Sequence, residues 1–418
     1  MRRGRGTCGR VIHETSFPKD RIKVLLLENI HPSAHELFRA DGFHLETLAG
    51  ALGAEELAAR IEDVHILGIR SKTRITDAAL AKARRLLAVG CFCIGTNQVD
   101  LESANRRGIP VFNAPFSNTR SVAEMIMAEI IMLARHLGDR SREMHTGAWR
   151  KTAAGSYEVR GKTLGIVGYG RIGRQVGVIA ESLGLRVIFC DITARLPMGN
   201  NHVTTLDELL AESDYVTLHV PETLQTRRMI STREVALMKR GACLLNASRG
   251  TVVDIDALAA GVKSGHLGGA AIDVFPEEPE TNSDGFVTSL QKLPNVVMTP
   301  HIGGSTAEAQ EAIGREVGTA LIKFVNAGVT AGAVNFPNVD SALTPGKHRI
   351  LNVHKNVPGV LRDINHIVSD KGANIVAQVL ATDANIGYLV MDIDQDVSLD
   401  VKNAIGALGT SLKTRILY

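Results

Sequence analysis

The stretch LGIVGYGRIG, residues 164–173, constrains the fold of this chain more than any other segment. An apolar run leads into Gly168, Gly170 and Gly173, which open a helical pattern. The first glycine permits a tight turn, the second lets the backbone approach a pyrophosphate, and the third allows close helix–strand packing. Asp191 ends the next apolar run, 23 residues after Gly168, where a carboxylate can accept hydrogen bonds from a ribose diol. This context predicts a dinucleotide site and favours NAD, because a carboxylate repels a 2′-phosphate; the alternative is a structural glycine turn with a surface aspartate.

Strand and helix patterns alternate along most of the chain. IKVLLLE (22–28) and HILGIR (65–70) predict early strands, and six apolar runs from LGIVGYG to NVVMTPH predict one doubly wound sheet. A long apolar helix is predicted at 121–147, packed between domains or subunits. Because the nucleotide-type unit begins in mid-chain, we infer that it is inserted into a first domain made from both flanks. The expected layout is a basic tail at 1–16, a substrate-binding domain at 17–117 and 304–340, an NAD-binding domain at 118–303, and a C-terminal domain at 341–418.

Composition limits the classes of function. A chain of 418 residues is expected to form two or three domains, and its formal net charge of +3 is too small and dispersed for a nucleic-acid surface. No apolar run reaches the length of a membrane span. The five cysteines lie mostly in apolar runs without metal-ligand spacing, which predicts reduced thiols, no metal site and a cytoplasmic protein. The N-terminal MRRGRGTCGR is either a disordered basic tail or a short transit peptide.

Three polar residues follow apolar runs of the predicted doubly wound sheet. Arg249 follows ACLLNAS, Glu278 follows GAAIDVF, and His301 ends NVVMTPH. Taken singly, the arginine is a solvated charge and the histidine a structural residue. Ligands, however, bind at the carboxyl ends of parallel strands, and the three residues beside a dinucleotide site suit the oxidation of a 2-hydroxy acid. A guanidinium binds the carboxylate, an imidazole takes the hydroxyl proton, and a glutamate orients the imidazole.

The motifs GYGRIG, NASRGTVVD, AAIDVFPEEP and TPHIGGST together resemble the D-isomer-specific 2-hydroxyacid dehydrogenase family. The resemblance implies an α/β protein in which a Rossmann-type, doubly wound NAD domain is inserted into a flavodoxin-like substrate domain. It also implies that Arg249, Glu278 and His301 are catalytic. Gly303 and Gly304 are expected to let the backbone crowd the nicotinamide. The residues expected to line the cofactor site are Thr96, Gly168, Gly170, Arg171, Ile172, Gly173, Asp191, Ala247, Ser248, Arg249, Asp273, His301, Ile302, Gly303 and Gly304.

The loop GIRSKT (68–73) follows a predicted strand and carries two cations and a hydroxyl. Arg70, Ser71 and Lys72 are either a phosphate anchor or an ordinary polar loop, and Asn118 is a further substrate-binding candidate. With the C-terminal segment, these stretches narrow the resemblance to family members that use NAD to oxidise 3-phospho-D-glycerate to 3-phosphohydroxypyruvate, the first step of L-serine biosynthesis from glycolysis. In those members the loop binds the substrate phosphate. The alternatives are a hydroxypyruvate or 2-oxoglutarate reductase, or an NAD-sensing binding protein similar to the corepressors of the same superfamily.

Residues 341–418 resemble an ACT domain, a βαββαβ ligand-sensing module that pairs across subunits. The resemblance implies an L-serine effector site at His354, Asn356 and Asn374, feedback inhibition, and a homotetramer assembled through cofactor-domain and ACT contacts. The regulated bacterial-type members have a glycine pair in the linker that reads LTPGKH here, and Pro345 makes this linker stiffer. The departure bears on how strongly serine binding is coupled to inhibition, and not on whether serine binds. From the residues alone, VPGVL is a proline-led helix start and Asn374 is a turn residue.

Overall fold

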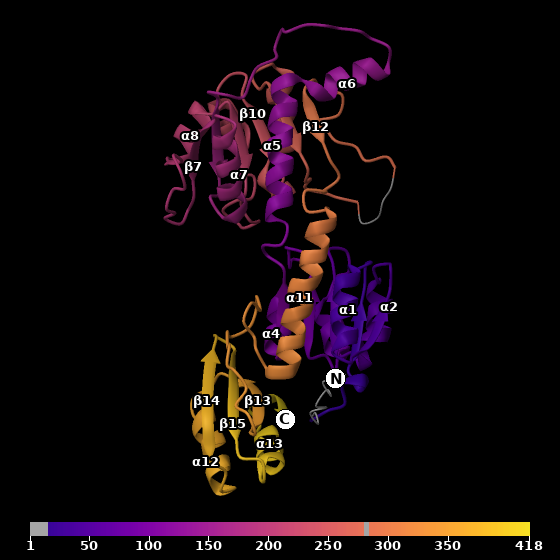
Figure 1. Cartoon of the computed structure of the whole chain (residues 1–418), viewed down its shortest axis with the longest axis vertical. Helices are drawn as coiled ribbons and strands as arrows, with labels where there is room; N and C mark the ends of the chain where they lie inside the picture. Colours follow the sequence, from indigo (N-terminus) through magenta and orange to yellow (C-terminus); the bar gives the residue numbers. More distant parts are fainter. Residues whose placement is uncertain (1–15, 280–283) are drawn as a thin grey trace, which may run out of the picture. The chain divides into compact units, whose positions relative to one another are not determined.

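The computed structural model describes residues 16–279 and 284–418. They divide into two compact units (Figure 1). The first unit contains the chain up to Pro115 and from Glu311 onward, and the second contains Phe116–Gln310. The predicted basic tail at 1–16 lies outside the described residues except for its last residue, and the predicted domain boundaries remain predictions.

The first unit contains a five-stranded parallel sheet in the order β2-β1-β3-β4-β5, which is the flavodoxin-like order. Its central strands are apolar without alternation, because apolar clusters that include helical residues cover both faces. The strands are β1 (Lys23–Leu26), β2 (His44–Thr47), β3 (Ile66–Ile69), β4 (Ala88–Cys91) and β5 (Val111–Asn113). The helices are α1 (Pro32–Ala40), α2 (Ala54–Arg60), α3 (Asp77–Lys82), α4 (Leu101–Arg106) and, from Glu311 onward, α11 (Ala307–Ala327), which begins in the second unit. The short 3₁₀ turns are η1 (Lys19–Arg21) and η2 (Ile61–Asp63).

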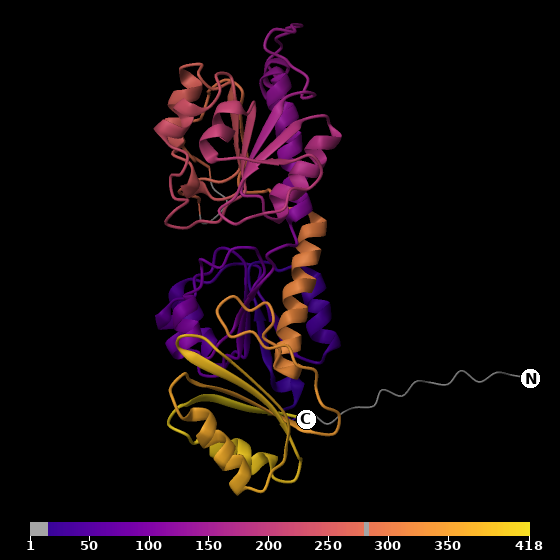
Figure 2. The ribbon, with the colours of Figure 1, turned by 90° about the vertical axis from the view of Figure 1, so that its left-hand side faces the viewer.

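The C-terminal part of the first unit has the predicted βαββαβ order. Its four antiparallel strands are arranged β14-β15-β13-β16. One face of the sheet is covered by two helices (Figure 2). Ile350 and Leu389 on this face belong to one apolar cluster with Ile364 and Ile405 of the helices. The elements are β13 (His348–Lys355), α12 (Val360–Asp370), β14 (Ile375–Thr382), β15 (Ile386–Ile393), α13 (Ser398–Gly406) and β16 (Ser411–Leu417).

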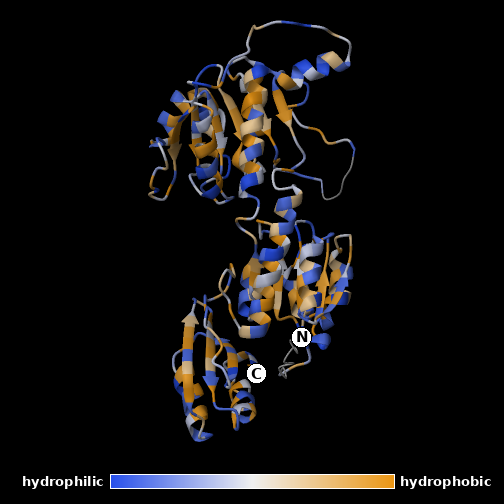
Figure 3. Ribbon diagram, in the orientation of Figure 1, coloured by the Kyte–Doolittle hydropathy of each residue, from blue (hydrophilic) through white to orange (hydrophobic). Residues whose placement is uncertain are grey.

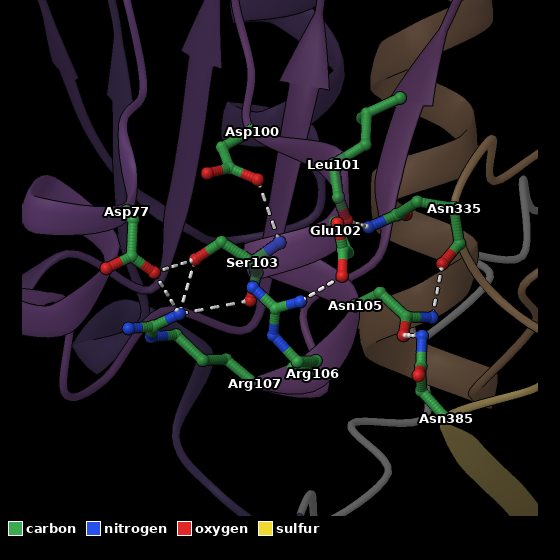
Figure 4. Close-up of polar contacts among 10 residues, drawn as sticks. All are labelled: Asp77, Asp100, Leu101, Glu102, Ser103, Asn105, Arg106, Arg107, Asn335 and Asn385. Atoms are coloured by element: carbon green, nitrogen blue, oxygen red, sulfur yellow. Dashed lines mark hydrogen bonds and ion pairs between the residues drawn. The ribbon is translucent and has the colours of Figure 1, made fainter.

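The opposite face of this antiparallel sheet joins the core of the parallel sheet. Leu351 and Tyr388 belong to the same buried apolar cluster as Phe112 of β5. Polar contacts reinforce the junction, since Asn385 Nδ2 donates to Asn105 Oδ1 at 3.2 Å (Figure 4). The parallel and antiparallel sheets are therefore parts of one compact unit.

The second unit contains a seven-stranded parallel sheet in the order β12-β11-β10-β9-β6-β7-β8. This is the doubly wound order. From β6 the chain adds strands first on one side (β7, β8) and then on the other (β9 to β12), and such folds bind dinucleotides at the point between β6 and β9 where the order switches. The six predicted strands are present, and β8, which has only two residues, was not predicted. The strands are β6 (Thr163–Val167), β7 (Arg186–Cys190), β8 (His202–Val203), β9 (Tyr215–Leu218), β10 (Cys243–Asn246), β11 (Gly269–Ile272) and β12 (Val296–Met298). The helices are α5 (Thr119–Arg135), α6 (Leu137–His145), α7 (Arg171–Ser182), α8 (Leu206–Glu212), α9 (Thr232–Leu237) and α10 (Ile255–Lys263), with the 3₁₀ turn η3 (Gly250–Val252).

The long helix predicted at 121–147 is two helices. α5 ends at Arg135, and His136 has φ +52°, a left-handed conformation that stops the helix before α6 begins. The His136 ring is anchored by a hydrogen bond between Nε2 and the Gly155 carbonyl at 2.9 Å. The apolar face of α5 packs on the sheet of its own unit, where Ile126 and Ile130 share a core with Leu164, so its apolar character reflects this packing.

Hydropathy follows the sheets in both units. Figure 3 shows the strands mostly in the hydrophobic colour, while hydrophilic residues lie on the outer sides of the helices. Within residues 16–279 and 284–418, no helix has the length and apolarity needed to cross a bilayer.

Candidate active site

The turn after β6 has the geometry that a bound pyrophosphate requires. Gly168 has φ +91°, and a Cβ there would lie 2.3 Å from the carbonyl oxygen of His219, so only glycine fits. A Cβ at Gly173 would lie 2.4 Å from the Gly168 carbonyl oxygen, whereas the space around Gly170, the N-cap of α7, is open. The unpaired N–H groups at the start of α7 therefore face a site that a phosphate can approach. These residues fit a dinucleotide.

Asp191 follows β7 at the place expected for ribose recognition. Its Oδ2 accepts a hydrogen bond from the Tyr169 N–H at 2.9 Å, and its Oδ1 accepts one from the Thr193 N–H at 2.8 Å. Arg195 Nε lies 3.6 Å from Oδ2. The carboxylate thus holds the glycine turn in place, and because each carboxylate oxygen can accept more than one hydrogen bond, it retains capacity for a ribose hydroxyl.

Arg171 and Ile172 follow the second glycine of the motif. The Arg171 guanidinium carbon lies 3.5 Å from the centroid of the Phe116 ring, a stacking contact that restricts the side chain beside the glycine turn. Ile172 packs against the apolar core under the sheet. Arg171 therefore brings a positive charge to the glycine turn, whereas Ile172 serves the core.

His301 and Glu278 form a hydrogen-bonded pair after the last two strands of the sheet. His301 Nδ1 lies 2.8 Å from Glu278 Oε2, so Nδ1 carries the proton in this bond and Nε2 faces away from the carboxylate. The other oxygen of Glu278 accepts a hydrogen bond from the Phe275 N–H at 3.1 Å. This arrangement orients the imidazole and leaves one ring nitrogen for proton transfer.

The electrostatics of the pair favour a charged imidazolium beside a carboxylate. The hydrogen bond with Glu278 raises the pKa of His301 above its ordinary value, against the effect of burial. Burial disfavours ionisation of Glu278, but the hydrogen bonds from His301 and from the Phe275 N–H outweigh it and lower the pKa of this carboxyl. The charge of Arg249 acts on both groups. Glu278 therefore stays ionised while His301 gains and loses a proton.

Asp273 holds the turn that carries His301. It is 1% exposed, and its Oδ1 accepts hydrogen bonds from Thr299 Oγ1 at 2.6 Å and the Ile302 N–H at 2.8 Å. Its Oδ2 accepts one from the Gly303 N–H at 2.9 Å. His301 itself has φ +55°, a strained left-handed conformation that this network maintains.

The two glycines after His301 accommodate protein atoms. A Cβ at Gly303 would lie 3.0 Å from Asp273 Oδ2, and a Cβ at Gly304 would lie 2.7 Å from Asn118 Nδ2. The nearest neighbours of a side chain added here are thus Asp273 and Asn118. The expected approach of this backbone to a nicotinamide remains a prediction.

Arg249 lies in a turn organised by the last residue of β10. Asn246 Oδ1 accepts hydrogen bonds from the Ser248 N–H at 3.0 Å and the Ser248 hydroxyl at 2.7 Å, and Asn246 Nδ2 donates to the Arg249 carbonyl at 3.0 Å. The Arg249 guanidinium is half-buried and donates to the Ser248 carbonyl at 2.6 Å. Ala247 and Ser248 belong to this same turn. The turn therefore carries both these predicted cofactor-lining residues and Arg249, the predicted anchor of the substrate carboxylate.

The predicted substrate-binding residues Arg70, Ser71 and Lys72 and the predicted cofactor-binding residue Thr96 lie in two loops of the first unit. Arg70, Ser71 and Lys72 follow β3, and Ser71 and Lys72 are exposed. Thr96 lies in the loop after β4, where its carbonyl accepts a hydrogen bond from the Val99 N–H at 3.0 Å. Asn118, by contrast, belongs to the second unit and is the N-cap residue of α5.

The three predicted effector residues lie at two ends of one sheet. His354 is buried at the end of β13, where its Nδ1 bonds Asn352 Oδ1 at 2.9 Å, and burial lowers its pKa. Asn356 follows the same strand and donates to the Asp383 carbonyl at 2.6 Å. Asn374 precedes β14 and is exposed.

The register of the sheet separates these residues. His354 pairs with Gly387 near the start of β15, whereas the residue after Asn374, Ile375, pairs with Ile393 at its end. Six residues of extended strand span roughly 20 Å. A single chain therefore does not bring the three residues together.

Two buried titratable residues beside the candidate site were missed in the sequence. Burial lowers the pKa of His219, which packs behind Gly168, to about 3. Burial, together with the charge of Asp273, raises the pKa of Glu129 on α5 to about 8. A glutamate within the apolar run AEMIMAEIIM is a signal that could have identified Glu129. Within the described part of the chain, no group of three or more His, Cys, Asp or Glu side chains is placed to hold a metal ion.

Comparison with protein families matches residues 127–303 to the NAD-binding domain of the D-isomer specific 2-hydroxyacid dehydrogenases. Residues 350–411 match an ACT domain like that of the AHAS small subunit. The first match contains the glycine turn, Asp191 and the His301–Glu278 pair, and the second contains His354, Asn356 and Asn374.

Comparison with individual proteins extends the similarity over nearly the whole chain. The sequence is 54% identical to D-3-phosphoglycerate dehydrogenase of Dictyostelium discoideum, over 97% of this chain and 99% of that protein. It is 52% identical to D-3-phosphoglycerate dehydrogenase of Escherichia coli K12, over 97% and 100% of the two chains. Among solved structures, D-lactate dehydrogenase from Aquifex aeolicus, complexed with NAD and lactic acid, matches with a TM-score of 0.68 and 28% identity. That match covers 75% of this chain and 100% of that one.

Proposed function

The chain belongs to the D-isomer specific 2-hydroxyacid dehydrogenase family, and on this premise we propose that it catalyses the NAD-dependent oxidation of 3-phospho-D-glycerate to 3-phosphohydroxypyruvate. The observation that carries the substrate is the identity of about half over almost the full length of relatives named D-3-phosphoglycerate dehydrogenase. The reaction is the first step of L-serine biosynthesis from glycolysis.

The residues of the second unit support a simple division of labour. Arg249 binds the carboxylate of the substrate, since a planar guanidinium matches a carboxylate with two parallel hydrogen bonds. His301 Nε2 takes the proton of the C2 hydroxyl, and Glu278 holds the other ring nitrogen and stabilises the imidazolium that forms. The turn of Gly168, Gly170 and Gly173 and the carboxylate of Asp191 would hold NAD, which when bound would supply the acceptor for the hydride of C2. The products are the 2-oxo acid, NADH and a proton that His301 releases to water.

The remaining substrate group is a phosphate, for which Arg70, Ser71 and Lys72 are the proposed anchor. Two cations and a hydroxyl at the end of a buried parallel strand suit a dianion. Asn118 is a further proposed contact. A phosphate anchor distinguishes the proposed function from that of a hydroxypyruvate reductase, because hydroxypyruvate carries no phosphate.

The direct experiment is NADH formation by the purified protein with 3-phosphoglycerate as the only substrate. We expect turnover with 3-phosphoglycerate and much less with unphosphorylated glycerate. A faster reduction of hydroxypyruvate or 2-oxoglutarate than of 3-phosphohydroxypyruvate would favour the reductase alternative. NAD binding without turnover on any of these acids would favour the NAD-sensing alternative.

We further propose that L-serine binds the ACT domain and inhibits the enzyme. His354 and Asn356 lie at one end of β15 and Asn374 at the other, so a complete site requires the complementary end of a second chain. The exposed Trp149, 79% of whose surface is accessible, is a candidate for a second contact between chains. With the ACT contact, such a second contact would give the homotetramer that we propose. A cytoplasmic location remains a prediction.

A further inference from the structure

The proposed phosphate loop is held at one side by a buried carboxylate that no sequence motif pointed to. Glu28 follows β1 and is 7% exposed. Its Oε2 accepts a hydrogen bond from the Lys72 N–H at 2.9 Å, and its Oε1 accepts one from the Thr73 N–H at 2.8 Å. Hydrogen bonds to a charged acceptor are stronger than neutral ones, so this carboxylate fixes the backbone where the loop leaves the site.

The other side of the loop is held by a buried amide. Gln98 is 7% exposed, and its Nε2 donates to the Arg70 carbonyl at 2.6 Å and to the Gly95 carbonyl at 3.2 Å. Gly95 precedes Thr96, the residue proposed to contact the nicotinamide. One side chain thus ties the proposed phosphate loop to the proposed cofactor loop.

The backbone at Glu28 is strained. Glu28 has φ +62° and Asn29 has φ +53°, a left-handed conformation that glycine adopts without strain and most other residues avoid. Such residues persist where the surrounding structure holds them, and they gather at functional sites. A glycine would relieve the strain at residue 28, but it would leave the Lys72 and Thr73 N–H groups without an acceptor.

The negative charge of Glu28 is unexpected beside a loop proposed to bind a phosphate. A carboxylate close to an anion site repels the anion, so its presence there is unfavourable for binding unless it does something else. Here both of its oxygens are used on two backbone N–H groups of the loop. Glu28 thus combines an unfavourable charge with a strained backbone. Both indicate that the protein needs this loop in one fixed conformation.

Glu28 and Gln98, called here the two braces of the loop, determine which groups the loop can offer to a ligand. They use the Arg70 carbonyl and the Lys72 and Thr73 N–H groups. Between them, the Ser71 N–H donates to no protein acceptor among the described residues, and the side chains of Ser71 and Lys72 are exposed. A backbone N–H, a hydroxyl and two cations are the groups that bind a tetrahedral oxyanion.

We infer that Glu28 and Gln98 are positioning residues for the substrate phosphate, which they hold in reach by fixing the Arg70–Lys72 loop and not by touching the substrate. This inference rests on the proposed function. Loss of either brace lets the loop relax and impairs recognition of the phosphate. Hydride transfer and NAD binding depend mainly on the second unit and are affected much less by loss of Glu28. Loss of Gln98 also releases Gly95, so it can weaken the proposed contact of Thr96 with the cofactor.

The test uses two variants and a matched control in the full-length protein. Glu28→Gln replaces one acceptor oxygen by an amino group, and Gln98→Met removes the donor at similar volume. Glu36→Gln makes the same change of charge on the exposed side of α1. The measured quantity is kcat/KM for 3-phosphohydroxypyruvate divided by kcat/KM for hydroxypyruvate, together with the KM for NADH. Losing a hydrogen bond of this kind should lower the ratio about tenfold or more in Glu28→Gln and in Gln98→Met. The NADH KM should stay nearly unchanged in Glu28→Gln, whose contacts are confined to the Lys72 and Thr73 N–H groups. Glu36→Gln should behave like wild type in both measurements.

A purely structural role would lower activity on both substrates equally, so an unchanged ratio in a folded Gln98→Met protein overturns the inference even if Glu28→Gln does not fold. The double variant Arg70→Ala/Lys72→Ala supplies a second check, because Glu28→Gln should have little further effect on the ratio once both cations of the anchor are gone. Fully additive effects would contradict action through the loop. If wild type itself shows no preference for the phosphorylated substrate, the proposed function fails instead, and the two failures are distinguishable.

Discussion

A histidine whose Nδ1 is bound to a carboxylate can offer only Nε2 to a ligand, and this is the situation of His301. The bond to Glu278 Oε2 is 2.8 Å long, and the turn around the histidine is held by three hydrogen bonds to Asp273. The protein therefore positions one nitrogen and restricts the ring before any substrate binds. This preorganisation is what general base catalysis requires.

Replacing His301 by alanine should lower kcat for 3-phosphoglycerate oxidation by about 10²–10⁴-fold, the usual contribution of a general base. NAD binding should persist, because the glycine turn and Asp191 are unaffected. Steady-state kinetics and titration with NAD measure the two effects separately. His202→Ala, at an exposed position on β8, is the control and should behave like wild type. Retained turnover in His301→Ala would exclude this residue as the base.

Replacing Glu278 by glutamine should shift the pH profile. In the native protein the hydrogen bond to Glu278 raises the pKa of His301 above 6.5, and oxidation needs the neutral imidazole, so kcat/KM rises as the pH rises through the raised pKa. Removing the carboxylate lowers the pKa, and the acidic limb of the profile should move to lower pH while the maximum falls. An acidic limb that stays in place would show that another group titrates.

The sequence pointed to both residues of this pair but not to the residues that support the proposed phosphate loop. Arg249, Glu278 and His301 follow strands of one sheet, where position along the chain indicates position in space. Glu28 and Gln98 act on backbone groups 44 and 28 residues away, through contacts that no local pattern encodes. Supporting residues of this kind become visible only when tertiary contacts are known.

Among the elements, strands were easier to predict than helix ends. All six predicted strands of the second unit are present, because buried parallel strands are continuous apolar runs. The prediction of one continuous helix at 121–147 was wrong at His136, whose left-handed conformation separates α5 from α6. Histidine carries no strong helix-stop signal, and the break depends on a hydrogen bond to Gly155 that is distant in sequence.

The turn between β6 and α7 gives a prediction at the scale of elements. Gly168→Ala places a Cβ 2.3 Å from the His219 carbonyl oxygen at a φ of +91°. Relief requires the turn to move, so unfolding free energy should fall by about 1–3 kcal/mol and NAD binding should weaken. Thermal unfolding and NAD titration measure these effects. Gly138→Ala, in α6 with open space around it, is the control and should be neutral or slightly stabilising. An unchanged NAD affinity in Gly168→Ala would contradict the proposed cofactor turn.

At the scale of the whole molecule, the ACT sheet and the parallel sheet of the first unit share one core. Leu351 and Tyr388 belong to the same apolar cluster as Phe112, and Asn105 contacts Asn385 across the junction. A ligand that changes the ACT sheet therefore acts on the unit that carries the proposed phosphate loop. This connection was not predictable from the linker LTPGKH, which suggested only that Pro345 restricts the joint.

Serine inhibition can be tested at this scale. Asn356→Ala removes the side chain that bonds the Asp383 carbonyl at one end of the ACT sheet, and it should raise the serine concentration needed for half-inhibition about tenfold or more, as expected for loss of a ligand hydrogen bond. Activity without serine should not change. Inhibition curves for wild type, Asn356→Ala and the exposed control Asn403→Ala provide the comparison. Superimposable curves for all three would remove Asn356 from the effector site.

The register of β15 has a consequence for mixtures of chains. If each effector site joins the His354–Asn356 end of one chain to the Asn374 end of another, a symmetric pair contains two sites. When expressed separately, chains carrying Asn356→Ala and chains carrying Asn374→Ala would each respond weakly to serine. In a hybrid of the two, both substitutions fall in one site and the other site is intact, so co-expressing the two weakly responding proteins would restore part of the response that each has lost.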